Sequence, residues 1–393
     1  MAKVLKKCDC RNQTRCEHPW TVRYREPGGR SGRQRERSFP TKREAESFGI
    51  KAENDKREGV YIDHQLGRVS LRKWAQEWLG QHPVNQSTRR NYQGFITNHL
   101  VPALGSKTIA GVTVADVKKL QTSMSAGGLA ASTVNDRMNI LRAMMAAAVK
   151  ERRIPESPCD GVAPLKTAGA AVDPDEIPTL AEVNAIAAAM SDQYRLTVWL
   201  QAGAGLRISE VLGFSADCQR NGFLRLRRQV SAKANQQDCK TRLVPLKHRT
   251  ADEYRDVPTP PFLDQEIGSH LKRWGTVTVD GLEVLFSPRE RGKGQMPTAS
   301  TYGYHWRKAL IAAGVVSPDG KPKYTPHSLR HFFASMALAN GVPIHEVSRW
   351  LGHRNIKTTV DTYGHLVPEA WDRCRDVIQN ALRPAPRLVA TAA

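Results

Sequence analysis

The residues best suited to chemistry lie in three short polar clusters in the second half of the chain. The clusters are Arg207 with Glu210, then His327 with Arg330 and His331, then His353 with Tyr363. A guanidinium group can bind a phosphate through two hydrogen bonds and keeps its charge at any working pH. A tyrosine hydroxyl can serve as a nucleophile. Together, these residue types could hold a phosphodiester and attack it.

The middle cluster lies on the clearest predicted helix. Thr325 is a suitable N-cap, Pro326 suits the first helical turn, and Gly341 marks the end. The two histidines and Arg330 are three and four residues apart, so they share one helix face near the N-terminus, where the helix dipole favours an anion. The alternative is a surface arginine beside two packed histidines.

The other two clusters lie at helix boundaries. The segment 203–210 ends one helix and begins another, and Glu210 follows Arg207 by one turn, so it could hold the guanidinium in place. An ordinary surface pair is the alternative. The segment 351–353 ends a short helix, and Asn355 can cap the next helix, which runs to Tyr363. A lone tyrosine is usually half-buried in packing contacts, so only the combination of all three clusters favours a catalytic role for Tyr363.

A separate group of metal-binding residue types lies near the N-terminus. Cys8, Cys10, Cys16 and His18 could form a tetrahedral zinc site. Their spacing departs from the usual gap of about two to four residues, and no second ligand pair follows. The alternative is a mobile tail with reduced thiols. A structural zinc ion is therefore one of two interpretations.

Charge indicates the class of partner. The 393 residues include 59 Lys and Arg and 38 Asp and Glu, a formal charge of +21. Such an excess attracts polyanions, so nucleic acid is favoured over a merely solvated basic surface. No apolar run approaches the ~20 residues that span a membrane, and no signal peptide is recognised. Seven scattered cysteines indicate reduced thiols, so we expect a cytoplasmic protein.

Composition and periodicity predict a mainly α protein with small β-sheets, an α+β fold. We expect a basic N-terminal module at 1–63 with strands at 20–25 and 33–39 and a helix from Thr41 to about Glu58. A four-helix domain follows at 66–163. Its second helix should stop before Pro102 and Gly105, and its fourth should be capped by Ser132 or Thr133. A linker at 164–178 precedes a domain at 179–383 with strands at 223–230, 241–246 and 254–257, and then a disordered tail at 384–393.

These motifs, in this order along the chain, resemble those of the tyrosine recombinases, or phage integrases. The matching pieces are Gly-Leu-Arg-Ile-Ser-Glu at 205–210, His-Ser-Leu-Arg-His at 327–331, Leu-Gly-His at 351–353, and Tyr363. The resemblance extends from about Arg72 to Leu382. It implies a core-binding domain in the four-helix segment. It also implies an arm-binding domain in the N-terminal module, although we predict two strands there where the family has three.

The resemblance assigns roles to individual residues. Arg207 and Arg330 would clamp the scissile phosphate, Tyr363 would attack it, and His327 and His353 would bind its oxygens or assist proton transfer. His331 would be a buried support. The family also has a lysine at a hairpin tip that protonates the leaving 5′ oxygen. Lys247, ahead of the Arg-x-Val-Pro segment at 255–258, is preferred over Lys240, with Lys233 third.

The implied function is site-specific DNA recombination through a covalent 3′-phosphotyrosine, which integrates a phage or plasmid element. No Asp/Glu cluster has two-metal spacing, so no metal is expected in catalysis. The implied partners are double-stranded DNA attachment sites and three further copies on DNA, with a monomer off DNA and a directionality factor as an optional partner. Trp371 and Val377 are candidates for helix exchange between copies or for packing within one chain. A type IB topoisomerase and a non-catalytic repressor are the alternatives.

Overall fold

The computed structural model divides the chain into two compact units, Met1–Thr167 and Ala168–Ala393. It describes residues 2–11, 16–28, 31–59, 61–62, 65–167, 169–231, 241–286, 296–366 and 371–382, so the predicted tail at 384–393 lies outside the described residues. Helices predominate and the sheets are small, which confirms the predicted fold class. Over the residues described, no helix combines the length and apolar character needed to cross a bilayer.

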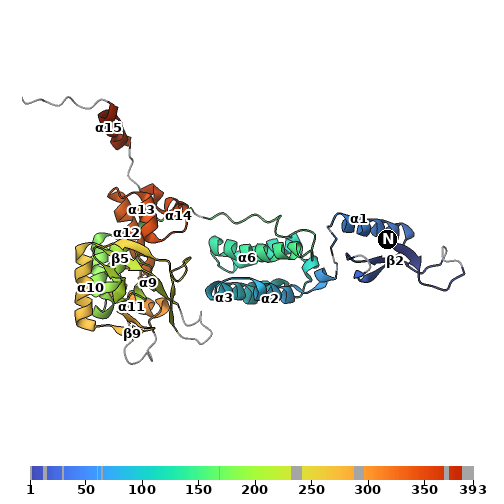
Figure 1. Cartoon of the computed structure of the whole chain (residues 1–393), viewed down its shortest axis with the longest axis horizontal. Helices are drawn as coiled ribbons and strands as arrows, with labels where there is room; N and C mark the ends of the chain where they lie inside the picture. Colours follow the sequence, from blue (N-terminus) through green and yellow to red (C-terminus); the bar gives the residue numbers. More distant parts are fainter. Residues whose placement is uncertain are drawn as a thin grey trace, which may run out of the picture. The chain divides into compact units, whose positions relative to one another are not determined.

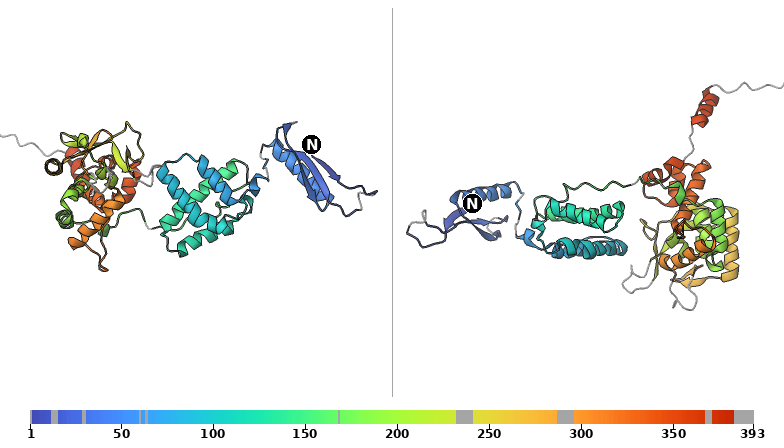
Figure 2. Two further views of the ribbon diagram at one scale, coloured as in Figure 1. Left: turned by 90° about the horizontal axis from the view of Figure 1, so that it is seen from below. Right: turned by 180° about the vertical axis from the view of Figure 1, so that it is seen from behind.

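The first unit begins with a three-stranded antiparallel sheet backed by one helix (Figure 1, Figure 2). Its elements are β1 (Lys3–Lys6), β2 (Trp20–Arg25), β3 (Gln34–Phe39) and α1 (Lys42–Arg57). A capping box begins α1, because Thr41 and Glu44 exchange side-chain and backbone hydrogen bonds. The prediction of two strands was wrong. The missed strand, β1, is only four residues long and shows no clear alternation, and it is recognisable only through its pairing with β2.

The rest of the first unit is helical. Its core is formed by Trp74, Trp78, Leu100, Met138 and other apolar side chains, and the Trp74 indole donates to the Met144 carbonyl to tie the first helix of this group to the last. The helices are α2 (Leu71–Gln81), α3 (Gln86–Phe95), a π-helical turn (Ile96–Leu100), α4 (Val101–Leu104), α5 (Val114–Ala126) and α6 (Ala131–Lys150).

Two helix boundaries predicted in this region were wrong. The chain stays helical past Pro102 to Leu104, because a π turn precedes the proline and places it in the first turn of α4, where its missing N–H is not needed. Helix α6 begins at Ala131, ahead of both predicted caps. The Val134 N–H already bonds the Ala130 carbonyl at 3.0 Å, so no side-chain cap is used.

The second unit packs helices around three small sheets and one extensive hydrophobic core. Its helices are α7 (Leu180–Ala189), α8 (Asp192–Ala204), α9 (Ile208–Leu212), α10 (Pro261–Trp274), α11 (Ala299–Ala312), α12 (Pro326–Ala339), α13 (Ile344–Leu351), α14 (Ile356–Tyr363) and α15 (Trp371–Leu382). Its strands are β4 (Gln219–Arg220), β5 (Phe223–Leu226), β6 (Arg228–Ser231), β7 (Arg242–Pro245), β8 (Arg255–Pro258), β9 (Val277–Val279) and β10 (Leu282–Val284).

The strand predicted at 223–230 is in fact two strands in different sheets. β5 pairs with β4 and β8, whereas β6 forms a hairpin with β7. The chain therefore changes sheets at Arg227. The segments predicted at 241–246 and 254–257 correspond to β7 and β8, and β9 with β10 forms a further two-stranded sheet that the sequence did not indicate.

Part of the predicted linker is built into the second unit. The Val172 side chain is buried in a small core with Leu338, Val347, Leu351 and Tyr363. Its backbone N–H donates to the Thr362 carbonyl at 3.0 Å. The segment that enters the second unit thus packs directly on the helix that ends at Tyr363.

Candidate active site

The break between α8 and α9 positions the first arginine of the site. Gly205 ends α8 with a positive φ of 63°, which glycine adopts without steric cost. A Cβ here would also lie 2.5 Å from Phe333 Cδ1 on α12. The turn leaves Arg207 as the N-cap residue of α9. The close approach of Gly205 to α12 brings this arginine to the helix that holds the second cluster.

Glu210 is the buried anion of the site. Its Oε1 accepts from Arg207 Nη1 at 3.0 Å, as the sequence predicted. It also receives two hydrogen bonds from Arg255 on β8, at 2.6 Å and 2.7 Å. Burial raises the pKa of Glu210, but the charges of Arg255, Arg207 and Arg330 outweigh it and lower the pKa to about 2. The carboxylate is therefore ionised at neutral pH and fixes two guanidinium groups.

Arg330 is almost fully buried at the start of α12. Its Nη1 donates to the Gly205 carbonyl at 2.5 Å and its Nη2 to the Leu351 carbonyl. The same Nη2 lies 3.3 Å from His353 Nε2. Burial and the charges of Arg207 and Arg255 lower the pKa of Arg330 from its usual value. This guanidinium is thus held rigidly by two helix ends, one from α8 and one from α13.

His353 is positioned by the end of α13 and the side of α14. Gly352 ends α13 with a φ of 67°, and its carbonyl accepts from Arg207 Nη2 at 3.4 Å. The His353 Nδ1 lies 2.8 Å from the hydroxyl of the buried Thr359. That contact leaves Nε2 directed at Arg330, so the imidazole lies in the same cluster as both predicted phosphate-binding arginines.

Tyr363 ends α14 with its side chain buried, and its hydroxyl lies 2.7 Å from His331 Nδ1. The His331 and His327 rings contact each other edge to face at 4.8 Å. Burial raises the pKa of Tyr363 to about 12, although Arg330 and Arg207 act in the opposite direction. The guanidinium groups favour the phenolate, but burial outweighs them, so the free protein holds a neutral phenol.

The three histidines of the site are neutral at pH 7. Burial lowers the pKa of His327 and of His331 to about 4, and nearby positive charges act in the same direction. Burial with the charges of Arg330, Arg207 and Arg255 lowers the pKa of His353 to about 3. A neutral imidazole can donate at one nitrogen and accept at the other. The histidines therefore add hydrogen-bonding groups to the site without adding charge.

The cluster as a whole has excess positive charge. Among the residues that the structure describes, the three guanidinium groups of Arg207, Arg255 and Arg330 face one carboxylate, that of Glu210. Buried charge of one sign is unfavourable unless an opposite charge joins it. An anion such as a phosphodiester would neutralise part of the excess. The arrangement is therefore suited to binding a phosphate.

We expect replacement of Glu210 by glutamine to destabilise the second unit. The carboxylate holds Arg255, whose side chain is buried, and breaking such a pair on one side costs about 3–5 kcal/mol. The folded pKa of about 2 lies below the ordinary value of 4.5 for a glutamate carboxyl. The stabilisation is therefore complete above pH 4.5 and is lost as the pH falls towards 2.

Calorimetric unfolding of the wild type and Glu210→Gln at several pH values between 7 and 3 tests this linkage. The difference in free energy of unfolding should be largest above pH 4.5 and should shrink at lower pH. Asp252→Asn serves as the control, because that carboxylate lies in the same unit and is exposed to solvent. A difference that stays constant with pH would contradict the assignment.

Lys247 does not lie at a hairpin tip as predicted. It follows β7, and the connection between β6 and β7 runs through 232–241, where Lys233 and Lys240 fall outside the described residues. The reason for preferring Lys247 was therefore wrong. Lys247 still belongs to a segment near the site, because its neighbour His248 has a pKa lowered by burial and by Lys247, Arg354 and Arg207.

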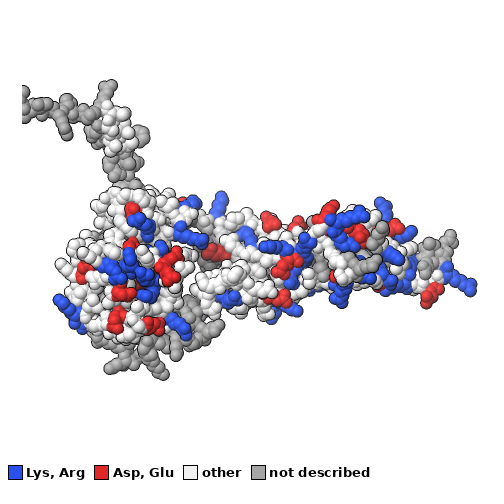
Figure 3. All heavy atoms as spheres, in the orientation of Figure 1, with Lys and Arg blue, Asp and Glu red and all other residues white. Residues whose placement is uncertain are grey.

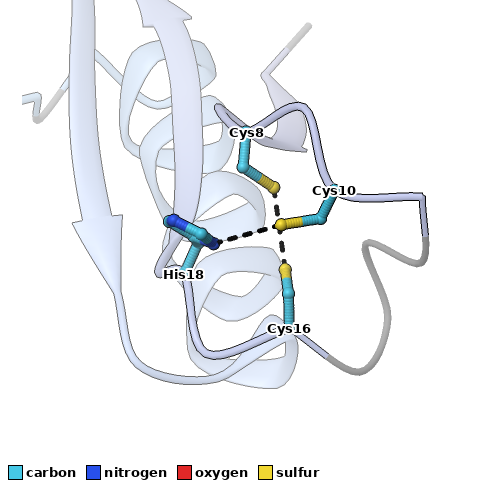
Figure 4. Close-up of side chains that lie close together, drawn as sticks. All are labelled: Cys8, Cys10, Cys16 and His18. Atoms are coloured by element: carbon cyan, nitrogen blue, oxygen red, sulfur yellow. Dashed lines mark hydrogen bonds between the residues drawn. The ribbon is translucent and has the colours of Figure 1, made fainter.

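The N-terminal cysteines and histidine form a second candidate site, separate in sequence from the arginine cluster. Cys8, Cys10, Cys16 and His18 each offer one ligand atom, and these four atoms all lie within 4.8 Å of one another (Figure 4). The structure thus brings together the group that the sequence singled out. The four residues lie between β1 and β2 in the sequence of the basic module.

Basic side chains are spread over both units (Figure 3). In the N-terminal module a depression is lined by Lys3, Arg23, Arg25, Lys56 and Arg57, among other residues. On β3, Arg35 forms an ion pair with Glu26, and Arg37 stacks over the rings of Phe39 and Phe48. The exposed basic side chains of the module therefore lie on β1, β2 and α1 as well as on β3.

The sequence did not identify three contributors to the arginine cluster. Arg255 anchors Glu210, Thr359 orients His353, and Val172 packs beside Tyr363. Arg255 opens the Arg-x-Val-Pro segment, so its position at the start of a strand was the available signal. Thr359 and Val172 gave none, because a threonine in a helix and a valine in a Pro-rich segment are ordinary.

The chain also matches known proteins. Residues 171–369 match the phage integrase family, and residues 70–125 match the phage integrase N-terminal SAM-like domain. The integrase of Mycobacterium phage L5 is 26% identical over 291 residues, which is 72% of each chain. A XerC-like tyrosine recombinase of Caldanaerobacter subterraneus subsp. tengcongensis is 26% identical over 356 residues, 84% of this chain and 87% of the relative.

Solved structures share the fold. The Tn1549 transposon integrase in complex with transposon right-end DNA has a TM-score of 0.66 at 20% identity, over 80% of this chain and all of that one. A lambda integrase tetramer bound to a Holliday junction has a TM-score of 0.54 at 16% identity, over 85% of this chain and 93% of that one. The family match from 171 to 369 includes the whole arginine cluster and Tyr363. The chain therefore belongs to the phage integrase family of tyrosine recombinases, the site-specific recombinases that cut and rejoin DNA.

Proposed function

We propose that this recombinase cuts DNA by attack of the Tyr363 hydroxyl on a phosphate held by Arg207 and Arg330. The observation that supports this most directly is the placement of the phenol. Its hydroxyl lies 2.7 Å from His331, the residue next to Arg330, in a cluster with excess positive charge. The guanidinium groups would stabilise charge that develops on the non-bridging oxygens. His327 and His353 would form hydrogen bonds with the same oxygens or assist proton transfer.

The reaction balances without an external energy source. The Tyr363 oxygen forms a bond to phosphorus, the bond from phosphorus to the 5′ oxygen breaks, and a 3′-phosphotyrosine results. The phenol loses its proton, and the leaving 5′ oxygen gains one. A second 5′ hydroxyl then attacks the phosphotyrosine, which restores the phosphodiester and the phenol. The bond energy is kept in the protein–DNA ester, so neither ATP nor a metal takes part.

His331 would hold the nucleophile between reactions. A neutral imidazole accepts a hydrogen bond from the phenol. The ring of Tyr363 is buried in the same small core as Val172 and Leu351. This contact lies within one chain, so we propose that Tyr363 acts on the DNA bound by its own protomer. Val377 on α15 is 65% exposed and is therefore available for contact with a neighbouring protomer.

We propose Lys247 as the general acid that protonates the leaving 5′ oxygen. Three variants, in which Lys233, Lys240 or Lys247 is replaced by methionine, test this. Proton donation is worth about 10²–10⁴-fold in rate. Lys247→Met should slow cleavage of an ordinary site by that factor. It should not slow cleavage of a site whose scissile 5′ oxygen is replaced by sulfur, because a thiolate leaves without a proton. If Lys240→Met or Lys233→Met shows this rescue instead, the acid is that residue.

The two units would share the DNA-binding work. We propose that the helical segment 66–163 and the domain at 179–383 bind the core of an attachment site, and that the basic module at 1–63 binds a second DNA segment. Four protomers would assemble on two sites and exchange strands through a Holliday junction, with a monomer off DNA in the cytoplasm and a directionality factor as a further partner. Binding should weaken steeply with salt, because Lys and Arg displace counterions from phosphates.

The assay for this function is recombination between two duplexes that contain the element and chromosomal attachment sites. We expect joined products, and footprinting on junctions of the element with the chromosome locates the sites. Relaxation of supercoiled plasmid without joined products would indicate a type IB topoisomerase activity instead. DNA binding without any covalent adduct on a nicked suicide substrate would indicate a repressor.

A further inference from the structure

The Cys/His cluster of the N-terminal module has the shape of a metal site. Cys8 and Cys10 follow the end of β1, and Cys16 and His18 precede the start of β2. In Figure 4 the three thiols and the imidazole point toward a common centre. The ligands come in two pairs, each with one residue between its members, so both ends of the connection contribute.

The distances fit four-coordinate zinc. With zinc–sulfur bonds of about 2.3 Å and zinc–nitrogen bonds of about 2.0–2.1 Å, a regular tetrahedron has sulfur–sulfur edges of about 3.8 Å and sulfur–nitrogen edges of about 3.6 Å. The Cys8 and Cys16 sulfurs are 3.6 Å apart, and the Cys10 sulfur is 3.6 Å from His18 Nδ1. A disulfide would require about 2.05 Å. These two distances match metal ligation and not a disulfide, and all four ligand atoms lie within 4.8 Å of one another.

A buried lysine provides an independent indication. Lys6 is 8% exposed, and its ammonium donates to the Cys16 carbonyl at 2.6 Å and to the Cys16 sulfur at 3.2 Å. It also lies 5.0 Å from the centre of the Trp20 ring. Lysine is rarely buried without an anionic partner. Three thiolates around a divalent ion have a net charge of −1, which the ammonium of Lys6 would neutralise.

We propose that Cys8, Cys10, Cys16 and His18 bind one structural Zn²⁺ ion. Three thiolates and one imidazole are a soft donor set of the kind that selects zinc over magnesium or calcium. All four positions of the tetrahedron would be filled by the protein, which is the arrangement of structural sites. Lys6 would be the neighbouring group that hydrogen-bonds a ligand sulfur and balances its charge.

The ion would hold the edge strand β1 in the sheet. β1 has four residues and, within the described part of the chain, pairs with β2 alone. The described core of the module consists of a few side chains, such as Val22, Tyr24 and Ala45. Small modules with limited cores commonly depend on a metal or a disulfide. Lys3 on β1 lines the basic depression with Arg23 and Arg25. Loss of the ion would therefore disturb part of the surface proposed to bind DNA.

Metal analysis of the full chain purified without chelator tests the site. Mass spectrometry of the elements should find about one zinc per chain, and cobalt exchanged into the site should show the visible and charge-transfer bands of tetrahedral thiolate ligation. His18→Ala should lower the zinc content at least about tenfold, whereas His18→Cys should keep it, because four thiolates are also a zinc donor set. Cys374→Ser removes an exposed thiol elsewhere and should have no effect.

The comparison of the two His18 variants separates metal binding from general misfolding. If the wild type holds no stoichiometric metal, or if His18→Ala retains it, the proposal is wrong. A disulfide between Cys8 and Cys16 in the purified protein would also overturn it. The measurement of bound metal does not involve DNA, so its result is independent of whether the protein recombines DNA as proposed.

Discussion

Tyr363→Phe should abolish the covalent protein–DNA adduct while DNA binding persists. Removal of a catalytic nucleophile commonly costs about 10⁴-fold or more in rate. Phenylalanine keeps the ring that packs with Val172, Leu338 and Leu351. The variant loses the hydroxyl, which leaves His331 Nδ1 without its partner at a cost of about 1–3 kcal/mol. The measurement is adduct formation on a nicked suicide duplex, resolved on a denaturing gel.

Tyr304→Phe is the matched control, since that tyrosine lies in the same unit and is 61% exposed. It should cleave at the wild-type rate. An adduct formed by Tyr363→Phe would show that another residue is the nucleophile. Mixing Tyr363→Phe with a second protein that lacks Arg330 tests action within one protomer, because complementation between the two would require the tyrosine to reach a neighbour's site.

Arg207→Gln should lower the rate of cleavage by about 10³–10⁵-fold, the range for arginines that stabilise a phosphoryl transition state. The fold should survive, because Glu210 keeps both hydrogen bonds from Arg255. The change also removes one of three clustered positive charges, so the melting temperature should stay the same or rise. Such a gain in stability at the expense of activity is common at functional sites.

Single-turnover cleavage and thermal unfolding, measured on the same preparation, test both parts of this expectation. Arg273→Gln is the control, because this arginine is exposed and pairs with Asp192 on the surface. Its cleavage rate should match the wild type. If Arg207→Gln cleaves within tenfold of the wild-type rate, Arg207 does not contact the reacting phosphate. If the variant unfolds, its role is structural.

The local elements of the site could be read from the sequence because they depend on neighbouring residues. Asn355 caps α14 through its side chain, Gly352 ends α13 in the left-handed conformation, and Thr41 with Glu44 forms the capping box of α1. Each of these follows from hydrogen bonds between residues a few positions apart. The same holds for the pairing of Arg207 with Glu210.

Non-local pairing was the main source of error. β1 is a strand only because it pairs with β2, and the segment 223–231 is divided because β5 and β6 have different partners. The position of Lys247 was misjudged for the same reason, because the hairpin partner of β6 decides where the tip lies. Strand pairing is set by contacts across the fold, which a single sequence does not display.

The types and order of the reactive groups were determined by the sequence alone, and with them the class of chemistry. Only the tertiary structure decided their energetic states. It places Arg255 on Glu210, binds the Tyr363 hydroxyl to His331, and buries the histidines until their pKa values fall to about 3 or 4. The physical reason is that charge, hydration and hydrogen bonding at a buried site depend on groups from α8, α12, α13, α14 and β8, which meet only when the chain folds.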